Sequence, residues 1–328
     1  MDQERIDERD ETELPRTAAR AVPSRSIALP AEAVTEDNRD VLISMAPARP
    51  QDRRLALGVV VVLTLVFLAL IPFARMPWTR IDAFIPAYEA ALAITDTLTA
   101  VLLFAQFSIV RSRALLVLAC GYVFTALTTI PHVLSFPGAF APTGLFGAGT
   151  ETTAWLYMFW HSGFPLVVVA YALLKNGHRH ETLHPAIAVA VTIGLVAVLA
   201  GIAYLDGNNL PPIVRGTGYT GIGSTFLASV WLLSVIALVT LWRRRPHALL
   251  DVWLMVVLCA WVYDIALSAV FNAGRFDFGF YAGRFYGLMA ASFVLIVLLA
   301  ETTWLYGRLA ASRVRLRDYA KTLESRVR

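Results

Sequence analysis

The sequence predicts an all-α membrane protein: a bundle of eight transmembrane helices with a disordered N-terminal tail and a C-terminal cytoplasmic helix of coiled-coil type. Three observations support this fold class. Apolar residues make up 57% of the 328-residue chain and charged residues only 16%, with a mean hydropathy of +0.62, whereas soluble domains are about 45–50% apolar and about 25% charged. Eight stretches are apolar over roughly 20 residues, the length that crosses a bilayer core of about 30 Å. After the last stretch, leucines recur every seven residues.

Residues 1–54 are predicted to form a disordered cytoplasmic tail. They begin MDQERIDERDETELPR and show no sustained apolar period, so they cannot bury enough surface to offset chain entropy. They also lack the basic start and apolar core of a secretory signal peptide. Residues 55–306 are then predicted to form the membrane domain, and residues 307–328 a cytoplasmic signalling helix continuous with the last span.

The apolar stretches must be helices, because lipid cannot hydrogen-bond an exposed backbone. Lys and Arg concentrate on one set of flanks, as in the three arginines at 243–245. The positive-inside rule therefore places both termini of this multi-pass membrane protein in the cytoplasm. We expect the lipid bilayer as a partner and no nucleic acid. The predicted spans are residues 55–74, 86–109, 114–134, 152–174, 185–205, 221–242, 248–271 and 281–306.

The heptad leucines Leu309, Leu316 and Leu323 follow the last span with no proline between them and the span. Such spacing favours a dimeric coiled coil that relays a signal. The same segment is rich in Lys and Arg, which favours instead a basic helix lying on anionic lipid. Both interpretations remain open.

Ionisable side chains inside spans are costly, so we take them as candidate ligand-binding or signal-sensing residues. Counted along the helices, most lie in the outer half of the bilayer, where a cavity open to the outside would require them. Trp160 joins them because it lies deep in the aromatic run 155–160. Asp264 and Arg284 form a candidate ion pair between adjacent spans. The candidates are Glu89, Asp96, His132, Trp160, His161, Asp264 and Arg284.

Two of these candidates are histidines with prolines nearby. Pro131 precedes His132, and Pro165 follows His161 by four residues, which frees the His161 carbonyl from its helical bond. One hypothesis is a kinked polar pocket, with His132 and His161 as metal or haem ligands or as proton sensors. The other is that each histidine hydrogen-bonds a neighbouring helix and stabilises packing. The sequence assigns no cofactor.

Other chemistry is disfavoured. The HETLH at 180–184 matches the H-E-x-x-H zinc-protease pattern, but its carboxylate partner would be Asp206, about 30 Å away across the membrane. Pro185 also disfavours the helix that the motif needs. A retinal Schiff base requires a lysine inside a span, and Lys175 and Lys321 lie outside the spans. We therefore expect that this chain is not an enzyme.

Several segments resemble the bacterial membrane-associated sensor (MASE) domains of type four, over about residues 80–306. The resemblance implies a sensory module placed before a cytoplasmic output domain, usually a histidine kinase or a diguanylate cyclase. It carries over no ligand and no binding residues. The segments are FIPAYE at 84–89, RSRALLVL at 111–118, IPH at 130–132, FPG at 136–138, TAWLYMFWH at 153–161, GRF at 274–276 and GFYAGR at 279–284.

Together with the spans, this resemblance implies a membrane-embedded sensory input module of a bacterial signal-transduction protein, such as a two-component system. It also implies location in the bacterial inner (plasma) membrane. The last span would relay the signal to a kinase or cyclase output domain that is missing from this chain, and the C-terminal helix would form a homodimer. The cytoplasmic partner would be that output domain or a response regulator. Residues 323–327 resemble the linker before such domains, so the chain is either a fragment or a stand-alone sensor. The alternative is a small-solute or ion transporter or channel, which Asp96 near the midplane would permit.

Overall fold

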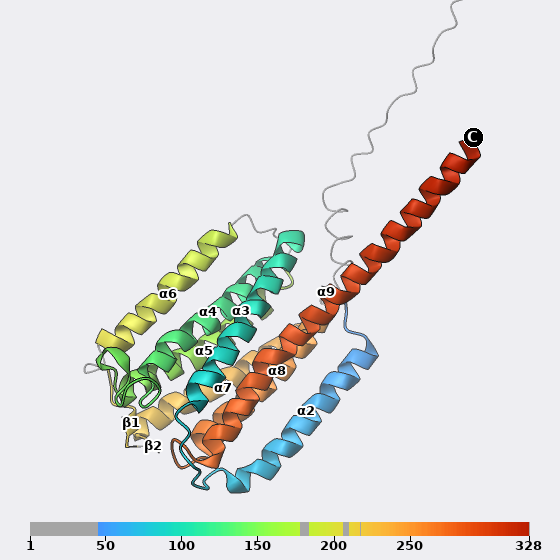
Figure 1. The fold of residues 1–328 in the computed structure, drawn as a ribbon. Coiled ribbons are helices and arrows are strands. Elements are labelled where there is room, and N and C mark those ends of the chain that lie inside the picture. Colours follow the sequence, from blue (N-terminus) through green and yellow to red (C-terminus); the bar gives the residue numbers. More distant parts are fainter. Residues whose placement is uncertain (1–44, 178–183, 206–209, 217, 328) are drawn as a thin grey trace, which may run out of the picture.

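The computed structural model describes residues 45–177, 184–205, 210–216 and 218–327 (Figure 1). Within them, eight helices are long and apolar enough to cross a membrane, which confirms the predicted fold class. Most helix ends lie within a few residues of the predicted spans. The long helices are α2 (Pro50–Leu70), α3 (Phe84–Val110), α4 (Arg113–Ser135), α5 (Thr150–Leu174), α6 (Pro185–Leu205), α7 (Gly221–Arg243), α8 (Leu249–Ile265) and α9 (Phe278–Val327).

Shorter elements lie in the connections. The 3-10 turn η2 (Ile71–Phe73) extends α2, η3 (Leu145–Gly147) precedes α5, and the π-helix η4 (Ala266–Val270) extends α8. Strands β1 (Val214–Arg215) and β2 (Gly218–Tyr219) form an antiparallel hairpin before α7. We call the end of the bundle that holds this hairpin the hairpin end, and the opposite end, where α9 leaves, the C-terminal end.

Helix α2 begins five residues earlier than predicted, at Pro50. Proline suits the first helical turn, because it lacks an amide that would need a partner there. The Asp52 carboxylate accepts the Arg49 backbone N–H at 3.0 Å, and the Ala48 N–H donates to the His247 carbonyl at 3.0 Å. The last part of the predicted tail is therefore ordered against the α7–α8 connection. The rest of that prediction, residues 1–44, lies outside the described residues.

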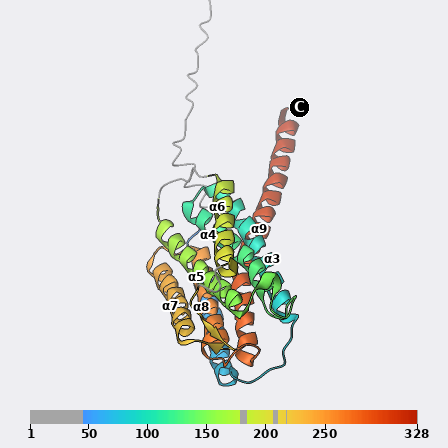
Figure 2. The same cartoon turned by 90° about the vertical axis from the view of Figure 1, so that its left-hand side faces the viewer.

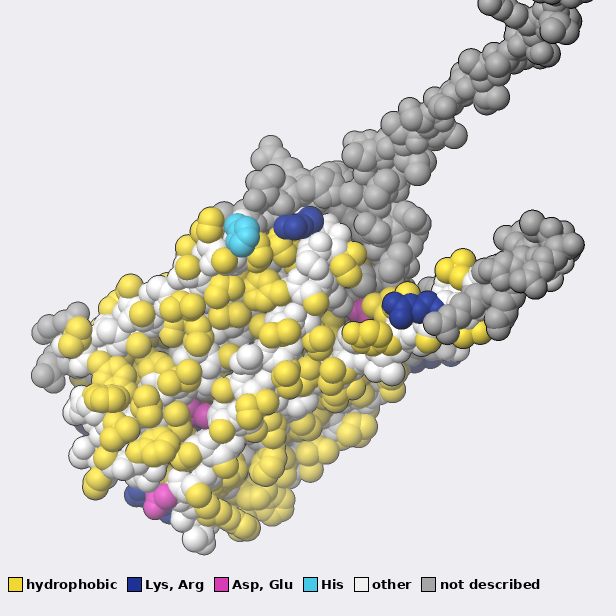
Figure 3. Space-filling model, turned by 45° about the horizontal axis from the view of Figure 1, so that its top comes forward, with side chains coloured by type: hydrophobic (Ala, Val, Ile, Leu, Met, Phe, Trp, Pro, Cys, Tyr) yellow, Lys and Arg dark blue, Asp and Glu magenta, His cyan; other side chains and the backbone are white. Residues whose placement is uncertain are grey.

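The helices form an inner group and an outer group (Figures 1 and 2). Helices α3, α4 and α5 pack in sequence, α8 and α9 pack on each other, and α9 also packs on α3. Helix α7 lies against α5 and α8, while α2 and α6 cover the outside. Outer apolar side chains such as Leu65 and Val191 remain 62% and 66% exposed. Exposed apolar side chains of this kind are expected where a helix contacts lipid. Hydrophobic side chains cover most of the face that Figure 3 shows.

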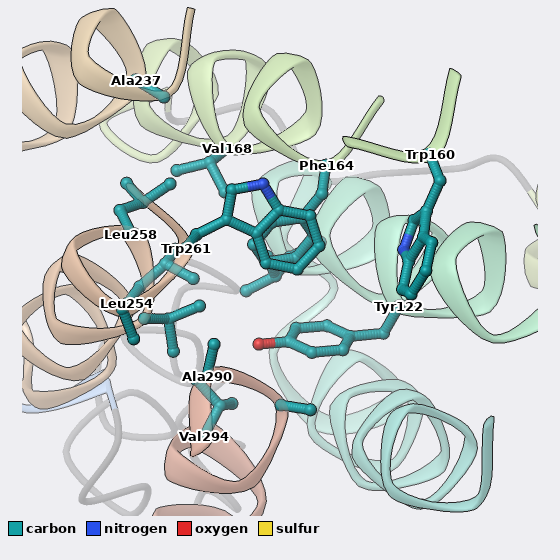
Figure 4. Packing of buried hydrophobic residues seen from close by; sticks show 14 of the residues in the cluster. Tyr122, Trp160, Phe164, Val168, Ala237, Leu254, Leu258, Trp261, Ala290 and Val294 are labelled. Atoms are coloured by element: carbon teal, nitrogen blue, oxygen red, sulfur yellow. The ribbon is translucent and has the colours of Figure 1, made fainter. Parts of the chain in front are cut away.

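The inner helices meet in an aromatic core. The Tyr122 ring on α4 meets the Phe164 ring on α5 edge-on at 5.4 Å, and Phe164 lies 5.1 Å from the Trp261 ring on α8. Figure 4 shows the Tyr122 hydroxyl directed from α4 toward Ala290 on α9. Because each ring comes from a different helix, the helices are held at fixed positions relative to one another.

Helix α9 approaches α8 closely through glycines. Gly279, Gly283 and Gly287 recur at every fourth residue, the small-residue spacing that lets membrane helices come into backbone contact. A Cβ atom on Gly283 would lie 2.8 Å from the Asp264 carbonyl oxygen, and one on Gly287 would lie 3.1 Å from Asp264 Oδ2. Side chains at these positions would force the two helices apart.

Helix α9 is continuous over 50 residues, from Phe278 to Val327. At 1.5 Å per residue this length corresponds to about 75 Å. The predicted last span 281–306 and the predicted cytoplasmic helix 307–328 are thus parts of one helix, which runs beyond the bundle in both views (Figures 1 and 2).

Candidate functional site

The first buried ion pair joins α3 to α4. His132 Nδ1 lies 2.6 Å from Glu89 Oε1, and the two side chains are 3% and 1% exposed. Both residues lie in the helix halves nearer the hairpin end. Such a short contact places a proton on the line between nitrogen and oxygen. The second oxygen of Glu89, Oε2, is buried and makes no hydrogen bond to any described residue.

The second pair joins α5 to α8. His161 Nδ1 lies 3.0 Å from the Tyr157 carbonyl oxygen, and His161 Nε2 lies 3.5 Å from Asp264 Oδ2. A carbonyl oxygen can only accept, so His161 Nδ1 carries a proton. Nε2 then faces a carboxylate oxygen, and one further proton must reside on either the imidazole or the carboxyl group for the contact to be attractive. The charge state of the pair therefore depends on this one proton, which either His161 or Asp264 holds.

Trp160 lies between the two pairs. Its ring centroid is 5.8 Å from that of His132 and 4.7 Å from that of His161. Tyr157 stacks on His161 at 3.7 Å, and Trp261 lies 4.9 Å from it. Trp160, a candidate from the aromatic run, thus lies beside both histidines, and the surrounding rings fix the orientation of the imidazoles.

Asp96 lies apart from both pairs, near the middle of α3, and is 5% exposed. It borders a small cavity of about 10 Å³ together with Tyr88, Tyr122, His161 and Asp264. A cavity needs about 10–15 Å³ to hold one water molecule, so this space suits a single water. We call Glu89, Asp96, His132, His161 and Asp264 the polar core.

The polar core in this conformation encloses no room for a macrocycle. His132 and His161 each face a different carboxylate, with Trp160 beside both. In the part of the chain that the structure describes, no three His, Cys, Asp or Glu side chains gather as a metal site would require. The haem or metal hypothesis thus stays a prediction without support from this geometry.

The predicted ion pair between Arg284 and Asp264 is wrong. Asp264 Oδ2 faces His161 Nε2, and Asp264 Oδ1 accepts a hydrogen bond from Ser268 Oγ at 3.2 Å. The Arg284 guanidinium instead lies over the Phe280 ring, 4.2 Å from its centroid. The glycine contacts explain the difference, because Gly283 and Gly287 form the face of α9 that packs against Asp264. Arg284 is turned about 100° around the helix from Gly283.

The relay leucines occupy the part of α9 outside the bundle. Leu309 and Leu316 are 49% and 65% exposed, and the side chain of Leu323 lies outside the described residues. Residues 180–183 of the HETLH motif and Asp206 also lie outside the described residues. The relay role therefore remains a prediction.

Several residues of the site were missed from the sequence. Ser268 connects Asp264 to the π-helix η4, and Tyr157 contacts both His161 and, at 3.4 Å, the Ser268 hydroxyl. Toward the C-terminal end, the Gln106 amide donates to Glu301 Oε2 at 2.6 Å and ties α3 to α9. Only Gly287 carried a usable signal, the four-residue glycine spacing on α9.

The polar core can hold protons and change its charge while buried. Removing the proton held by His161 or Asp264, or protonating Glu89, would change the charge among packed helices, where water cannot screen it. Gly287 of α9 lies against Asp264. A change of charge there would act directly on the helix that leaves the bundle.

Comparison with known proteins gives one family. The family model described as MASE4, a membrane-associated sensor, integral membrane domain, matches residues 79–306. This range begins between α2 and α3, ends within α9 and contains the whole polar core. No curated protein matches the chain, and no solved structure matches it.

Proposed function

Because the chain belongs to the MASE4 family of membrane-associated sensors, integral membrane domains, we propose that it is the sensory input module of a bacterial signal-transduction protein. It resides in the inner membrane with both termini in the cytoplasm. Helix α9 connects it to a cytoplasmic output domain, a histidine kinase or a diguanylate cyclase. The family description is that of a sensor, which agrees with a module that performs no catalysis itself.

The observation that carries this proposal is the continuity of α9. One end of the helix packs by Gly283 and Gly287 against Asp264, and the other runs beyond the bundle. A helix without a break transmits displacement or rotation along its length. The glycines that contact the polar core and the exit toward the cytoplasm therefore belong to one continuous helix.

The signal acts by shifting the bundle between two packing states. Because the polar core is closely packed, a change in its charge favours a different arrangement of α8 and α9 rather than a gradual deformation. The buried contact between Gln106 and Glu301 fixes α9 to α3 farther along. Rotation of α9 about that contact would reach the exposed segment that carries Leu309 and Leu316.

This exposed segment forms the homodimer contact through its heptad leucines. Leu309 and Leu316 are solvent-exposed in the single chain, and paired helices bury such positions. The lipid-lying alternative places the same segment on anionic headgroups instead.

The test is a fusion of residues 1–328 to a histidine kinase domain, with the autophosphorylation rate in membranes as the readout. We expect His161→Gln and Asp264→Asn each to change the rate several-fold, because each alters the proton held by the pair. The matched controls are His184→Gln and Asp82→Asn, both at exposed positions, and they should leave the rate unchanged. Unchanged rates in His161→Gln and Asp264→Asn, at normal membrane levels, would remove the polar core from the mechanism.

A further inference from the structure

A second pocket lies at the hairpin end, separate from the small cavity of the polar core. It measures about 200 Å³ and lies between the β1–β2 hairpin, the π-helix η4 and the start of α9. π-Helices are rare and often occur at functional sites. No Asp or Glu lines the pocket within the described residues. Its polar lining consists of Tyr219, Ser224, Ser268, Asn272, Arg275 and Arg284.

Arg284 is the deepest charge in this lining. The residue is 8% exposed, and its Nη1 atom is buried without a hydrogen-bond partner. Its guanidinium contacts the faces of Phe280 and Tyr157, at 4.2 and 5.5 Å. These aromatic faces attract a cation, but they leave its N–H donors without an acceptor. A buried charge in this condition is costly unless an anion reaches it.

Arg275 adds a second positive charge to the lining, from the loop between η4 and α9. Its guanidinium lies over the Phe136 ring at 5.2 Å and makes one long hydrogen bond, 3.4 Å from Nη2 to the Thr150 carbonyl oxygen. Burial lowers the pKa of Arg275 from its ordinary value, and the charge of Arg284 lowers it further. The two arginines therefore repel each other across the pocket.

Two carboxylates near the pocket, those of Glu151 and Asp277, already accept hydrogen bonds from backbone amides. Glu151 accepts the N–H groups of Ile213 and Val214, both at 3.0 Å, and so fixes the start of the hairpin. Asp277 accepts three backbone N–H groups of the loop and helix start around it, those of Ala273, Gly274 and Phe280. Neither carboxylate lines the pocket within the described residues. Glu151 and Asp264 act on Arg275 and Arg284 through their charge from outside it, so an acceptor inside the pocket would have to come from a ligand.

We propose that this pocket binds a small anion whose carboxylate or phosphate oxygens lie between Arg275 and Arg284. A guanidinium presents N–H donors in a planar fork that fits two oxygens of such a group. The hydroxyls of Ser224 and Tyr219, which make no hydrogen bond to another described residue, add donors on the hairpin side. A volume of about 200 Å³ suits a small ion better than the drug-sized ligands of larger pockets, which occupy about 300–1,000 Å³.

The pocket and the polar core share a wall. Ser268 lines the pocket and donates to Asp264. A bound anion would therefore change the electric field at the proton held by Asp264 or His161. The claim that this anion is the signal rests on the proposed function. The claim that the pocket binds an anion does not.

Binding is tested on the purified chain in nanodiscs of zwitterionic lipid. Inorganic phosphate and malonate are titrated separately at constant ionic strength, and binding is followed by calorimetry and by the shift in melting temperature. We expect saturable binding and a rise in melting temperature. The affinity should fall at least ten-fold in Arg275→Gln and in Arg284→Gln. The control Arg215→Gln removes an exposed arginine of the same hairpin and should bind like the unaltered chain.

The source of the anion is tested in nanodiscs that contain phosphatidylglycerol. If this lipid raises the melting temperature of the unaltered chain but not of the two variants, and soluble anions do not bind, the occupant is a lipid headgroup. Arg275 is half-buried, so its variant stays informative if Arg284→Gln fails to fold. Equal affinity in Arg275→Gln and the unaltered chain, or no binding of phosphate, malonate or phosphatidylglycerol, would overturn the proposal. These measurements need no output domain, so their outcome is independent of the kinase-fusion test of the proposed function.

Discussion

Buried acidic residues and histidines of this protein pair with one another across neighbouring helices. Glu89 and His132 connect α3 to α4, and His161 and Asp264 connect α5 to α8. A buried charge is tolerated only with a partner, so each pair both places a charge in the membrane interior and joins two helices. The polar core is therefore a structural element and a candidate switch at once.

The Glu89–His132 pair allows a stability test. Glu89→Ala leaves the His132 ring without its acceptor and should lower the free energy of unfolding by about 3–5 kcal/mol, as expected for half of a buried pair. Glu89→Gln keeps an acceptor oxygen and should cost clearly less, on the order of 1 kcal/mol. Reversible unfolding in mixed micelles measures both.

The control for this test is Asp82→Ala. The Asp82 side chain is 58% exposed and pairs with the equally accessible Arg80, so its loss should change the free energy of unfolding by less than about 1 kcal/mol. Equal costs for Glu89→Ala and Glu89→Gln would show that the hydrogen bond to His132 adds nothing to stability.

At the residue scale, composition was enough to select the candidates but not to pair them. Glu89, His132, His161 and Asp264 stood out because charged or titratable groups are rare within spans. Which carboxylate faces which histidine depends on how far one helix is shifted along its neighbour. The pairing predicted for Arg284 failed for this reason, since the contact of Gly287 with Asp264 sets the register.

At the scale of elements, α8 and α9 form the decisive contact. The glycines at 279, 283 and 287 bring the α9 backbone onto α8, and the π-helix η4 closes α8 with the Phe271 N–H bonded to the Ala266 carbonyl at 2.8 Å. Hydropathy predicted both ends of the span formed by α8 and η4, and the start of α9, to within three residues. It could not predict the π-helix, because the wider hydrogen-bond spacing leaves no trace in apolar content.

Substitution of a single glycine tests this contact. In Gly287→Ala the new Cβ would collide with the Tyr88 hydroxyl and lie 3.1 Å from Asp264 Oδ2. We expect a loss of about 1–3 kcal/mol in the free energy of unfolding, because overpacking displaces the helices. The control is Gly194→Ala on α6, where a Cβ meets no atom within 4 Å, and alanine there should be neutral or stabilising. Equal effects at both positions would contradict the close approach of α8 and α9.

At the scale of the whole molecule, α9 connects the two ends of the bundle. Its start lies in the anion pocket and against the polar core, Glu301 contacts α3, and its last turns extend beyond the other helices (Figure 1). Sequence patterns predicted this continuity, because no proline or glycine cluster interrupts the chain between the apolar run and the heptad leucines. The orientation in the membrane and the dimer rest on charge bias and leucine spacing, and both remain predictions.

The most direct test of a rigid relay is a helical-phase scan. One to seven alanines are inserted after Arg313 in the kinase fusion, and the autophosphorylation rate is measured for each length. If α9 transmits the signal as a continuous helix, output should be disturbed by short insertions and return near the unaltered rate at seven residues, the heptad repeat. An output that does not depend on the number of inserted residues would contradict transmission through α9.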